Sequence, residues 1–267
     1  MKKNTAVGVG AALLCVIMAL TLDHDNFMVL LNPTAMILVL GGTCALAFAV
    51  GTLEESKSLP KIIKKALLAV PEDSTGTVQR LVEMATVAQK NGLLALEQAG
   101  KDETDPFFQR GIGLVVDGKD AETIRTLLEA DLDATAARHA HRAHILKQAG
   151  GFAPTLGIIG TVIGLVHVMT NISSPSTLGP AIGAAFTATL WGVLSANLFW
   201  HPMASKLVRL SDAETAARQA VIEGLLAIQA GERPRAVQAL MLSFLPAGPA
   251  PRGASDEQAV MQEQGAA

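Results

Sequence analysis

Two threonines in apolar surroundings are the side chains of this chain that could do chemistry. Thr161 lies in the run GGFAPTLGIIGTVIGLVHVM, and helical steps of four and three place it on one stripe with Gly157 and Gly164. A second apolar run repeats the pattern, with Thr189 three residues before Gly192. Small residues let two helices approach closely in lipid, and hydroxyl oxygens between them could bind a cation or water. The two stripes therefore predict a close helix pair beside an ion path.

A proline and the absence of acids strengthen the prediction of an ion path. Pro154 cannot donate a backbone hydrogen bond, so the carbonyl one turn earlier can bind water or a cation. The uncharged run 148–205 contains no Asp or Glu. A chain that moves cations here must therefore take its ion-carrying carboxylate from a partner. His167 is the titratable group of the third apolar stretch, and it is either functional or a hydrogen-bonded packing residue.

The composition argues against an enzyme and against nucleic-acid binding. The chain has 267 residues, of which 50% are hydrophobic, and a net charge of −3 without the basic patches that phosphate backbones require. It has no glycine-rich phosphate loop and no H-E-x-x-H or G-x-S-x-G motif. His139, His141 and His144 do not share one helical face, so we expect no metal site. We expect no cofactor, and we interpret Cys15 and Cys44 as apolar packing residues.

Four apolar stretches are long enough to cross a membrane. Residues 4–22 and 33–53 form a first predicted hairpin. The run 148–205 divides at the turn sequence NISSPSTLGP into spans near 151–170 and 181–201. The first stretch could instead be a signal peptide, but no A-x-A cleavage site follows it. We therefore predict an all-α polytopic membrane protein with four transmembrane helices and a helical cytoplasmic domain between the second and third.

Lysine and arginine in the flanks predict the orientation. They precede the first and third spans and follow the second and fourth, while the two hairpin loops have none. Both termini are therefore predicted to be cytoplasmic. The predicted domains are a hairpin over 1–53, a cytoplasmic helical domain over 54–147, an ion-path hairpin over 148–205, cytoplasmic C-terminal helices over 206–245 and a disordered tail over 246–267.

The predicted cytoplasmic domain shows no strand-like alternation and reads as helices separated by short turns. A helix is expected from about Thr77 to Leu96. Asp120 is expected to cap another helix, which continues towards the third span. The basic amphipathic stretch KIIKKALLAV, residues 61–70, suits either the inner membrane surface or an ordinary surface helix.

Several motifs in combination resemble the MotA/PomA flagellar stator subunits, which share a core with the ExbB and TolQ proteins. They are the two threonine-bearing runs, LLNPTAMILVLGGT, AQKNGLLALE, GLVVDGKDAETI and GERPRAVQALMLSFLP, and they cover nearly all of residues 1–245. The resemblance implies a pentamer of this chain in the bacterial inner membrane, around two helices of a MotB/PomB-like partner. That partner would supply the ion-carrying aspartate, and ion flow would turn the pentamer against the rotor protein FliG.

The small-residue stripes and the resemblance together assign roles to single residues. Many relatives carry an arginine where this chain has Gln89, so the basic rotor contact would rest on Lys90 alone. Without the resemblance, Lys90 and Glu97 would be ordinary exposed charges of a solvated helix. The assigned residues are Thr161, Thr189, Pro154 and Pro202 for the ion path, Gly157, Gly160, Gly164 and Gly192 for helix packing, and Lys90 and Glu97 for rotor contact.

Two other function classes compete with the flagellar stator that we favour. An ExbB/TolQ-like subunit, which energises outer-membrane transport, would typically have three spans and lack the N-terminal hairpin. A non-motor membrane protein would use the threonines for packing only. The coupling ion stays open between sodium and protons. Thr161 resembles the sodium-driven PomA branch, but hydroxyls can equally order water for protons.

Overall fold

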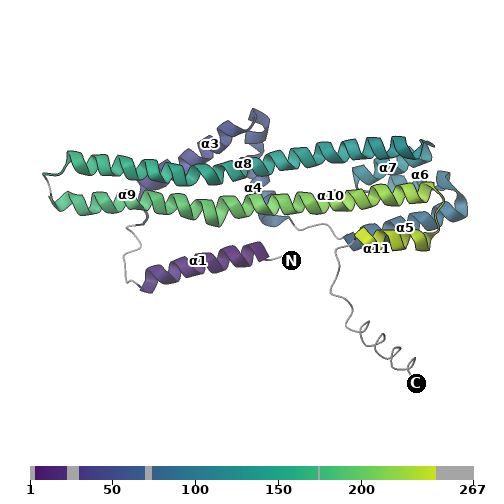
Figure 1. The fold of residues 1–267 in the computed structure, drawn as a ribbon, viewed down its shortest axis with the longest axis horizontal. Helices are drawn as coiled ribbons and strands as arrows, with labels where there is room; N and C mark the ends of the chain where they lie inside the picture. The colour runs from purple at the N-terminus through teal and green to yellow at the C-terminus, as the bar shows by residue number, and fades with distance from the viewer. Residues whose placement is uncertain (1–3, 23–29, 70–73, 174, 245–267) are drawn as a thin grey trace, which may run out of the picture. The chain divides into compact units, whose positions relative to one another are not determined.

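The structure, a computed structural model, describes residues 4–22, 30–69, 74–173 and 175–244 (Figure 1). These residues are helical and include no strand, which confirms the predicted all-α fold. The predicted disordered tail, 246–267, lies outside the described residues. The elements are α1 (Asn4–Leu22), α2 (Pro33–Met36), η2 (Ile37–Gly41), α3 (Gly42–Val50), α4 (Leu53–Leu68), α5 (Ser74–Asn91), η3 (Leu93–Ala95), α6 (Leu96–Asp102), α7 (Pro106–Val116), α8 (Ala121–Thr170), α9 (Pro175–Ser195), η4 (Ala196–Trp200), α10 (His201–Gln229) and α11 (Pro234–Phe244).

Apolar helices lie where the sequence predicts membrane spans. Three helical stretches are long and apolar enough to cross a membrane, namely Pro33–Val50, Ala121–Thr170 and Leu178–Gln229. Helix α1 adds a shorter apolar stretch, Val7–Met18. The protein is therefore a helical polytopic membrane protein.

The chain packs as two compact units. The described residues of Met1–Pro71 and Ala134–Ala213 form unit 1, and those of Glu72–Asp133 and Glu214–Ala267 form unit 2. The long helices α8 and α10 contribute residues to both. The predicted domain boundaries depend on the position of the membrane and not on packing, so they stay predictions.

Unit 1 contains the apolar spans. Helix α9 packs against α2 and η2, and α3 packs against α4. The N-terminus of α2 is capped by Asn32, whose Oδ1 accepts the N–H groups of Thr34 at 3.0 Å and Ala35 at 3.2 Å. A buried cluster joins α4 to α8 and α10, and its larger members are Ile62, Ile145, Leu146, Trp200, Met203 and Leu207.

Two π-helical segments, η2 and η4, interrupt spans that we expected to be plain α-helices. Segment η4 ends at Trp200, and the backbone N–H of the next residue, His201, donates to Ala196 O five residues earlier. Pro202 follows and has no N–H to offer Leu198 O, so a wider turn fits the missing donor. The fourth predicted span is therefore built from α9, η4 and the start of α10.

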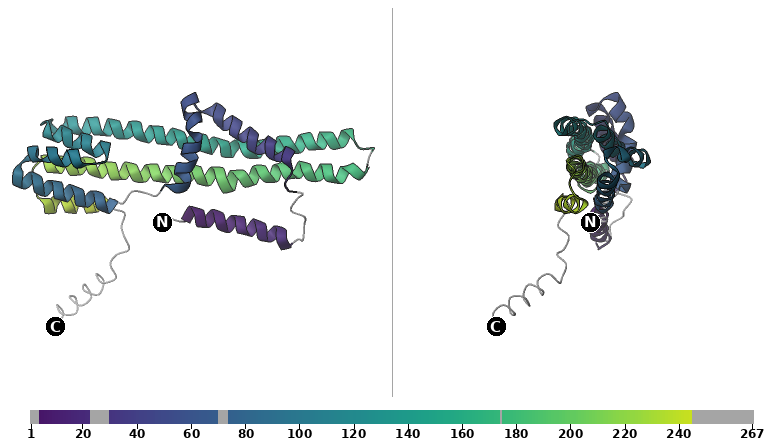
Figure 2. Two further views of the ribbon diagram at one scale, coloured as in Figure 1. Left: turned by 180° about the vertical axis from the view of Figure 1, so that it is seen from behind. Right: turned by 90° about the vertical axis from the view of Figure 1, so that its right-hand side faces the viewer.

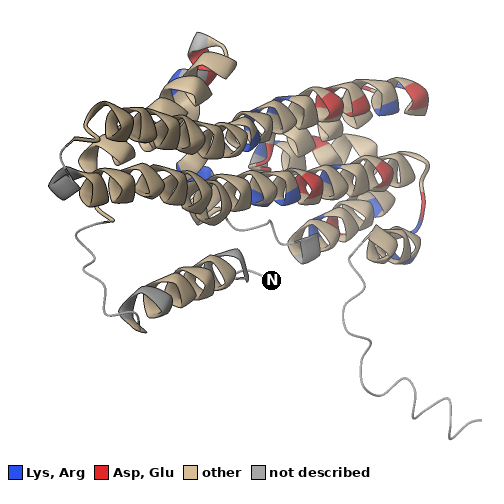
Figure 3. Ribbon diagram, turned by 60° about the vertical axis from the view of Figure 1, so that its left-hand side comes forward, with Lys and Arg blue, Asp and Glu red and all other residues tan. Residues whose placement is uncertain are grey.

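Unit 2 has a core of large apolar side chains. Helix α11 packs along α5, and α6 packs against α7 (Figure 2). Phe108 of α7, Leu128 of α8 and Leu225 of α10 are fully buried in this core. Charged residues line the helical segments of unit 2, whereas α9 carries none (Figure 3). Unit 2 thus has the pattern of a domain that folds in water.

Two helix boundaries bear on the predictions for the region before the third span. The Oδ1 atom of Asp120 accepts the N–H of Thr123 at 2.9 Å, and α8 continues from there to Thr170. The predicted cap and the continuous helix are confirmed. The helix expected to reach Leu96 instead ends at Asn91. The reason is Gly92, whose φ of +82° turns the chain out of the helix.

Candidate functional site

The backbones of α8 and α9 touch along the predicted small-residue stripes. A β-carbon added to Gly157 would lie 2.9 Å from Ala188 O and 3.0 Å from Thr189 Cα. A β-carbon added to Gly192 would lie 2.7 Å from Ala153 O. The obstructing atoms belong to the backbone, so neither contact can be relieved by turning a side chain.

The same contact, which we call the seam, continues along α8. A β-carbon on Gly164 would lie 2.5 Å from Ala185 Cβ, and one on Gly160 would lie 2.6 Å from Ala188 Cβ. All four glycines assigned to helix packing therefore lie in the seam.

Thr161 and Thr189 face each other across the seam. Their hydroxyl oxygens are hydrogen-bonded to each other. Thr161 Oγ1 also lies 3.1 Å from Gly157 O and 3.2 Å from Ala185 O. Thr189 Oγ1 lies 3.3 Å from Gly157 O. We call these four oxygens the threonine cluster: the two hydroxyl oxygens and the carbonyl oxygens of Gly157 and Ala185. Four contacts connect them, but the two hydroxyls supply only two protons. Acceptors therefore outnumber donors, which suits a cation or a water molecule.

Pro154 lies beside the seam, because a β-carbon on Gly192 would be 3.2 Å from its Cα. Pro154 lacks the N–H that Gly150 O would accept in a regular α-helix. A β-carbon on Gly150 would lie 2.6 Å from His201 Cε1, so this imidazole packs against α8. The sequence alone did not single out His201, because Gly150 lies on a different helix far away along the chain.

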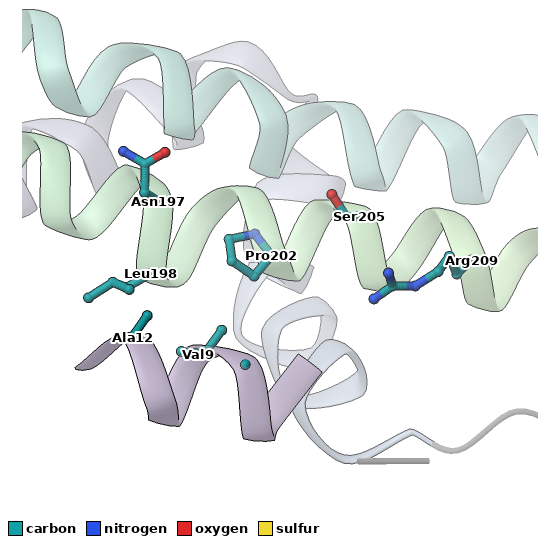
Figure 4. Close-up of a pocket in the computed structure, with 8 residues that line it drawn as sticks. Val9, Ala12, Asn197, Leu198, Pro202, Ser205 and Arg209 are labelled. Atoms are coloured by element: carbon teal, nitrogen blue, oxygen red, sulfur yellow. The ribbon is translucent and has the colours of Figure 1, made fainter. Parts of the chain in front are cut away.

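Pro202 lines a different site. It borders a cavity of about 380 Å³ between α1 and the stretch formed by η4 and α10, to which neither threonine contributes (Figure 4). The structure thus gathers Thr161, Thr189 and Pro154 at one seam and leaves Pro202 apart from them. The lining residues of the cavity are Gly8, Val9, Ala12, Asn197, Leu198, Pro202, Ser205 and Arg209.

His167 lies near the C-terminal end of α8 and is exposed. Asn171 Nδ2 lies 3.4 Å from its Nε2. The carbonyl of His167 accepts hydrogen bonds from Asn171 Nδ2 and Thr170 Oγ1, both at 2.9 Å. Its partners therefore belong to the end of the helix and not to the threonine cluster.

The residues assigned to rotor contact lie on the two arms of a hairpin in unit 2. Lys90 is exposed in the last turn of α5, Glu97 is exposed in the first turn of α6, and Gly92 turns the chain between them. Lys101 Nζ lies 2.9 Å from Glu97 Oε1, and its hydrogen bond and charge lower the pKa of Glu97. Both side chains are presented to solvent, where salt weakens ionic contacts.

A partly buried ion pair closes the base of this hairpin. Glu103 Oε1 lies 2.7 Å from Arg80 Nη1, and the Glu103 side chain is only 3% exposed. The same oxygen accepts the backbone N–H groups of Thr104 at 2.8 Å and Asp105 at 3.0 Å. Nothing in the sequence marks this pair, because its members are 23 positions apart and look like ordinary surface charges.

Residues 99–220 match the model of the MotA/TolQ/ExbB proton channel family. Motility protein A of Bacillus subtilis is 35% identical over 251 residues, which cover 92% of each chain. Chemotaxis protein PomA of Vibrio alginolyticus is 34% identical over 244 residues, 91% of this chain and 95% of PomA.

A solved structure gives the same answer. The fold is similar to a chain of the flagellar MotAB stator complex from Bacillus subtilis, with a TM-score of 0.84, 34% identity, and coverage of 92% of this chain and 97% of that one. The resemblance read from the motifs is confirmed: the chain belongs to the MotA/TolQ/ExbB proton channel family, among its motility protein A members.

Proposed function

We propose that this chain is a flagellar motor stator subunit that forms a cation path with a MotB/PomB-like partner. It matches a motility protein and a chemotaxis protein over nearly their whole length. This favours a motor over an ExbB/TolQ-like transport subunit. The chain is a channel and motor component and not an enzyme.

The observation that carries the proposal is the threonine cluster. It places two hydroxyls and two backbone carbonyls together between apolar helices. The run 148–205 around it has no acidic residue. A cation entering this region finds oxygen ligands but no counter-charge, so the partner supplies the aspartate that carries the ion.

The remaining parts of the proposal concern assembly and output. Five copies surround two partner helices in the bacterial inner membrane, with both termini in the cytoplasm. Lys90 and Glu97 contact FliG, and ion flow turns the pentamer against it. The coupling ion is sodium or the proton. Pro154 contributes a freed carbonyl beside the threonine cluster, and Pro202 contributes one at a separate point of the path, next to the cavity at α1.

The test is swimming of a bacterium that lacks its own stators and expresses this chain with its candidate partner. Speed is measured at fixed pH with and without sodium. Swimming in both media favours protons, and swimming only with sodium favours sodium. No swimming, with stable expression and a compatible rotor confirmed, would shift the assignment to an ExbB/TolQ-like subunit.

Two threonine variants test the cluster itself. We expect Thr161→Ala and Thr189→Ala to lower swimming speed strongly, because each removes a cluster oxygen. Thr161→Ser keeps the hydroxyl and should keep most of the swimming speed. The matched control is Thr155→Ala on the same helix, since Thr155 is exposed and, among the described residues, its hydroxyl bonds only to Phe152 O, at 2.7 Å. Equal effects at positions 155 and 161 would contradict a specific role for the cluster.

A further inference from the structure

Helix α4 has two faces, and the structure determines what its apolar face does. Ile62 and Ala66 are buried in the core of unit 1, with Leu59 and Ile63 packed beside them. The apolar stripe thus rests on protein. This contradicts the hypothesis that α4 lies on the membrane with its apolar stripe in lipid.

Both ends of α4 are held in place. At its N-terminus Thr52 Oγ1 accepts the N–H of Glu55, and Glu55 Oε2 accepts the N–H of Thr52 at 2.9 Å. At its C-terminus Lys206 Nζ donates to Leu67 O at 2.9 Å. Because the helix is anchored on one face and at both ends, its outer face has a fixed direction.

The outer face of α4 carries four lysines, which we call the lysine face: Lys57, Lys61, Lys64 and Lys65. Steps of four, three and one keep them on one side of the helix. All four are exposed. Within the described part of the chain, no carboxylate forms an ion pair with any of them.

The lysine face lies close in sequence to a predicted membrane span. Helix α3 ends at Val50 and α4 begins at Leu53, and the two helices pack against each other. Six residues separate Val50 from Lys57 in the sequence, so the lysines begin within a short reach of the bilayer surface. Beyond them, Leu67 is 52% and Leu68 is 68% exposed.

We propose that the lysine face binds the anionic headgroups of phospholipids at the membrane surface next to α3. Clustered basic residues beside a span are attracted to anionic lipid, by about fivefold in affinity for each lysine. Lysine ammonium groups act as point charges without the planar fork of arginine, which suits a fluid layer of phosphates better than one fixed carboxylate. Leu67 and Leu68 extend the surface with apolar side chains.

The experiment uses the chain in complex with its partner, in nanodiscs made from equimolar phosphatidylcholine and phosphatidylglycerol. Native mass spectrometry counts the lipids that stay bound. We expect enrichment of phosphatidylglycerol around the natural chain, and a loss of about 25-fold in that preference for Lys61→Gln with Lys64→Gln, which removes two lysines. Added salt should reduce the enrichment.

Two control variants separate lipid binding from other effects of charge. Lys119→Gln with Arg235→Gln removes the same charge from exposed positions of unit 2 and should leave the enrichment unchanged. Lys61→Arg with Lys64→Arg keeps the charge and should keep the enrichment. The proposal fails if the natural chain shows no preference for phosphatidylglycerol. It also fails if the glutamine variant keeps the phosphatidylglycerol enrichment but changes the number of copies in the assembly. That result would assign the lysine face to contact with a neighbouring copy.

Discussion

The seam of unit 1 and the core of unit 2 are both tightly packed, but with different atoms. In the seam, a β-carbon on Gly157 would meet the backbone of α9. In unit 2, a β-carbon on Gly224 would meet the ends of side chains, Leu81 Cδ1 at 2.8 Å and Met241 Sδ at 3.2 Å. The first obstacle is rigid, and the second can move aside.

The large apolar side chains follow the same division. Ile158, Ile163 and Val166 on α8 are 57%, 57% and 58% exposed, whereas Phe108 and Leu225 in unit 2 are fully buried. In water, burying such side chains drives folding. In lipid their burial brings little gain, so helices associate through close backbone approach and interhelical hydrogen bonds. One chain therefore uses two kinds of packing, each suited to its solvent.

The largest effect should come from emptying the core of unit 2. Phe108→Ala should destabilise unit 2 by about 3–5 kcal/mol, because it removes a fully buried ring and leaves a cavity. Hydrogen exchange measured by mass spectrometry should show faster exchange across α5, α6 and α7. Amides of α9 should keep their protection, and equal loss in α9 would show that the two kinds of packing are not independent.

A side chain placed in the seam should have the next largest effect. Gly157→Val forces the valine against backbone atoms, and overpacking of this kind costs about 1–3 kcal/mol or more. We expect a lower melting temperature of the purified complex and loss of swimming. Gly151→Val is the control on the same helix, since a β-carbon there has no neighbour within 4 Å. If both variants behaved alike, the seam would not be the constraint.

Breaking the ion pair at the base of the hairpin should have a smaller effect. Glu103→Gln should lower the free energy of unfolding of unit 2 by about 1–3 kcal/mol, because it removes the charge that Arg80 and two backbone N–H groups share. Hydrogen exchange over residues 92–105 should increase. Glu83→Gln on α5 is the control, since Glu83 is exposed and, within the part of the chain that the structure describes, its side chain bonds only to Gln79 Nε2, at 3.2 Å. Increased exchange in both variants would indicate a general charge effect.

The smallest effect concerns the helix caps, which differ between the units. The hydroxyl and the backbone N–H of Thr123 hydrogen-bond to Asp120 and lower its pKa. A lowered pKa means that the cap stabilises the fold above the ordinary aspartate pKa of about 3.9 and loses this contribution as the pH falls through the folded value. Asn32, which caps α2, does not titrate.

Protection of the first turn of α8 from hydrogen exchange should therefore decline on acidification. The cap of α2 has no titrating group, so it should not make the protection of α2 depend on pH. Hydrogen exchange between about pH 6 and pH 3, corrected for the intrinsic rate, measures both turns together. Asp120→Asn should remove the pH dependence at α8. A decline that persists in this variant would assign the acid sensitivity to another group.

The features visible in the sequence are those with a local or periodic cause. The apolar runs, the stripe that joins Gly157 to Thr161 and the cap at Asp120 all depend on residues within a few turns of each other. The end of α5 was misplaced because Gly92 can remain within a helix as well as end one.

The features that could not be read from the sequence depend on contacts between distant segments. Arg80 and Glu103 resemble solvent-exposed charges until the hairpin folds and buries the carboxylate. A proline alone does not produce the wide turn of η4 beside Pro202, because α8 stays α-helical through its own proline, Pro154. His201 becomes noticeable only when Gly150 is found beside it.

The threonine cluster has a consequence for the arrangement of its protons. Its two hydroxyl protons can be distributed over the four contacts in more than one way, and no heavy atom has to move when a hydroxyl reverses its direction. The cluster therefore keeps orientational entropy that a fixed ion pair lacks. It can present either a donor or an acceptor by turning a hydroxyl, while the two helix backbones stay in place.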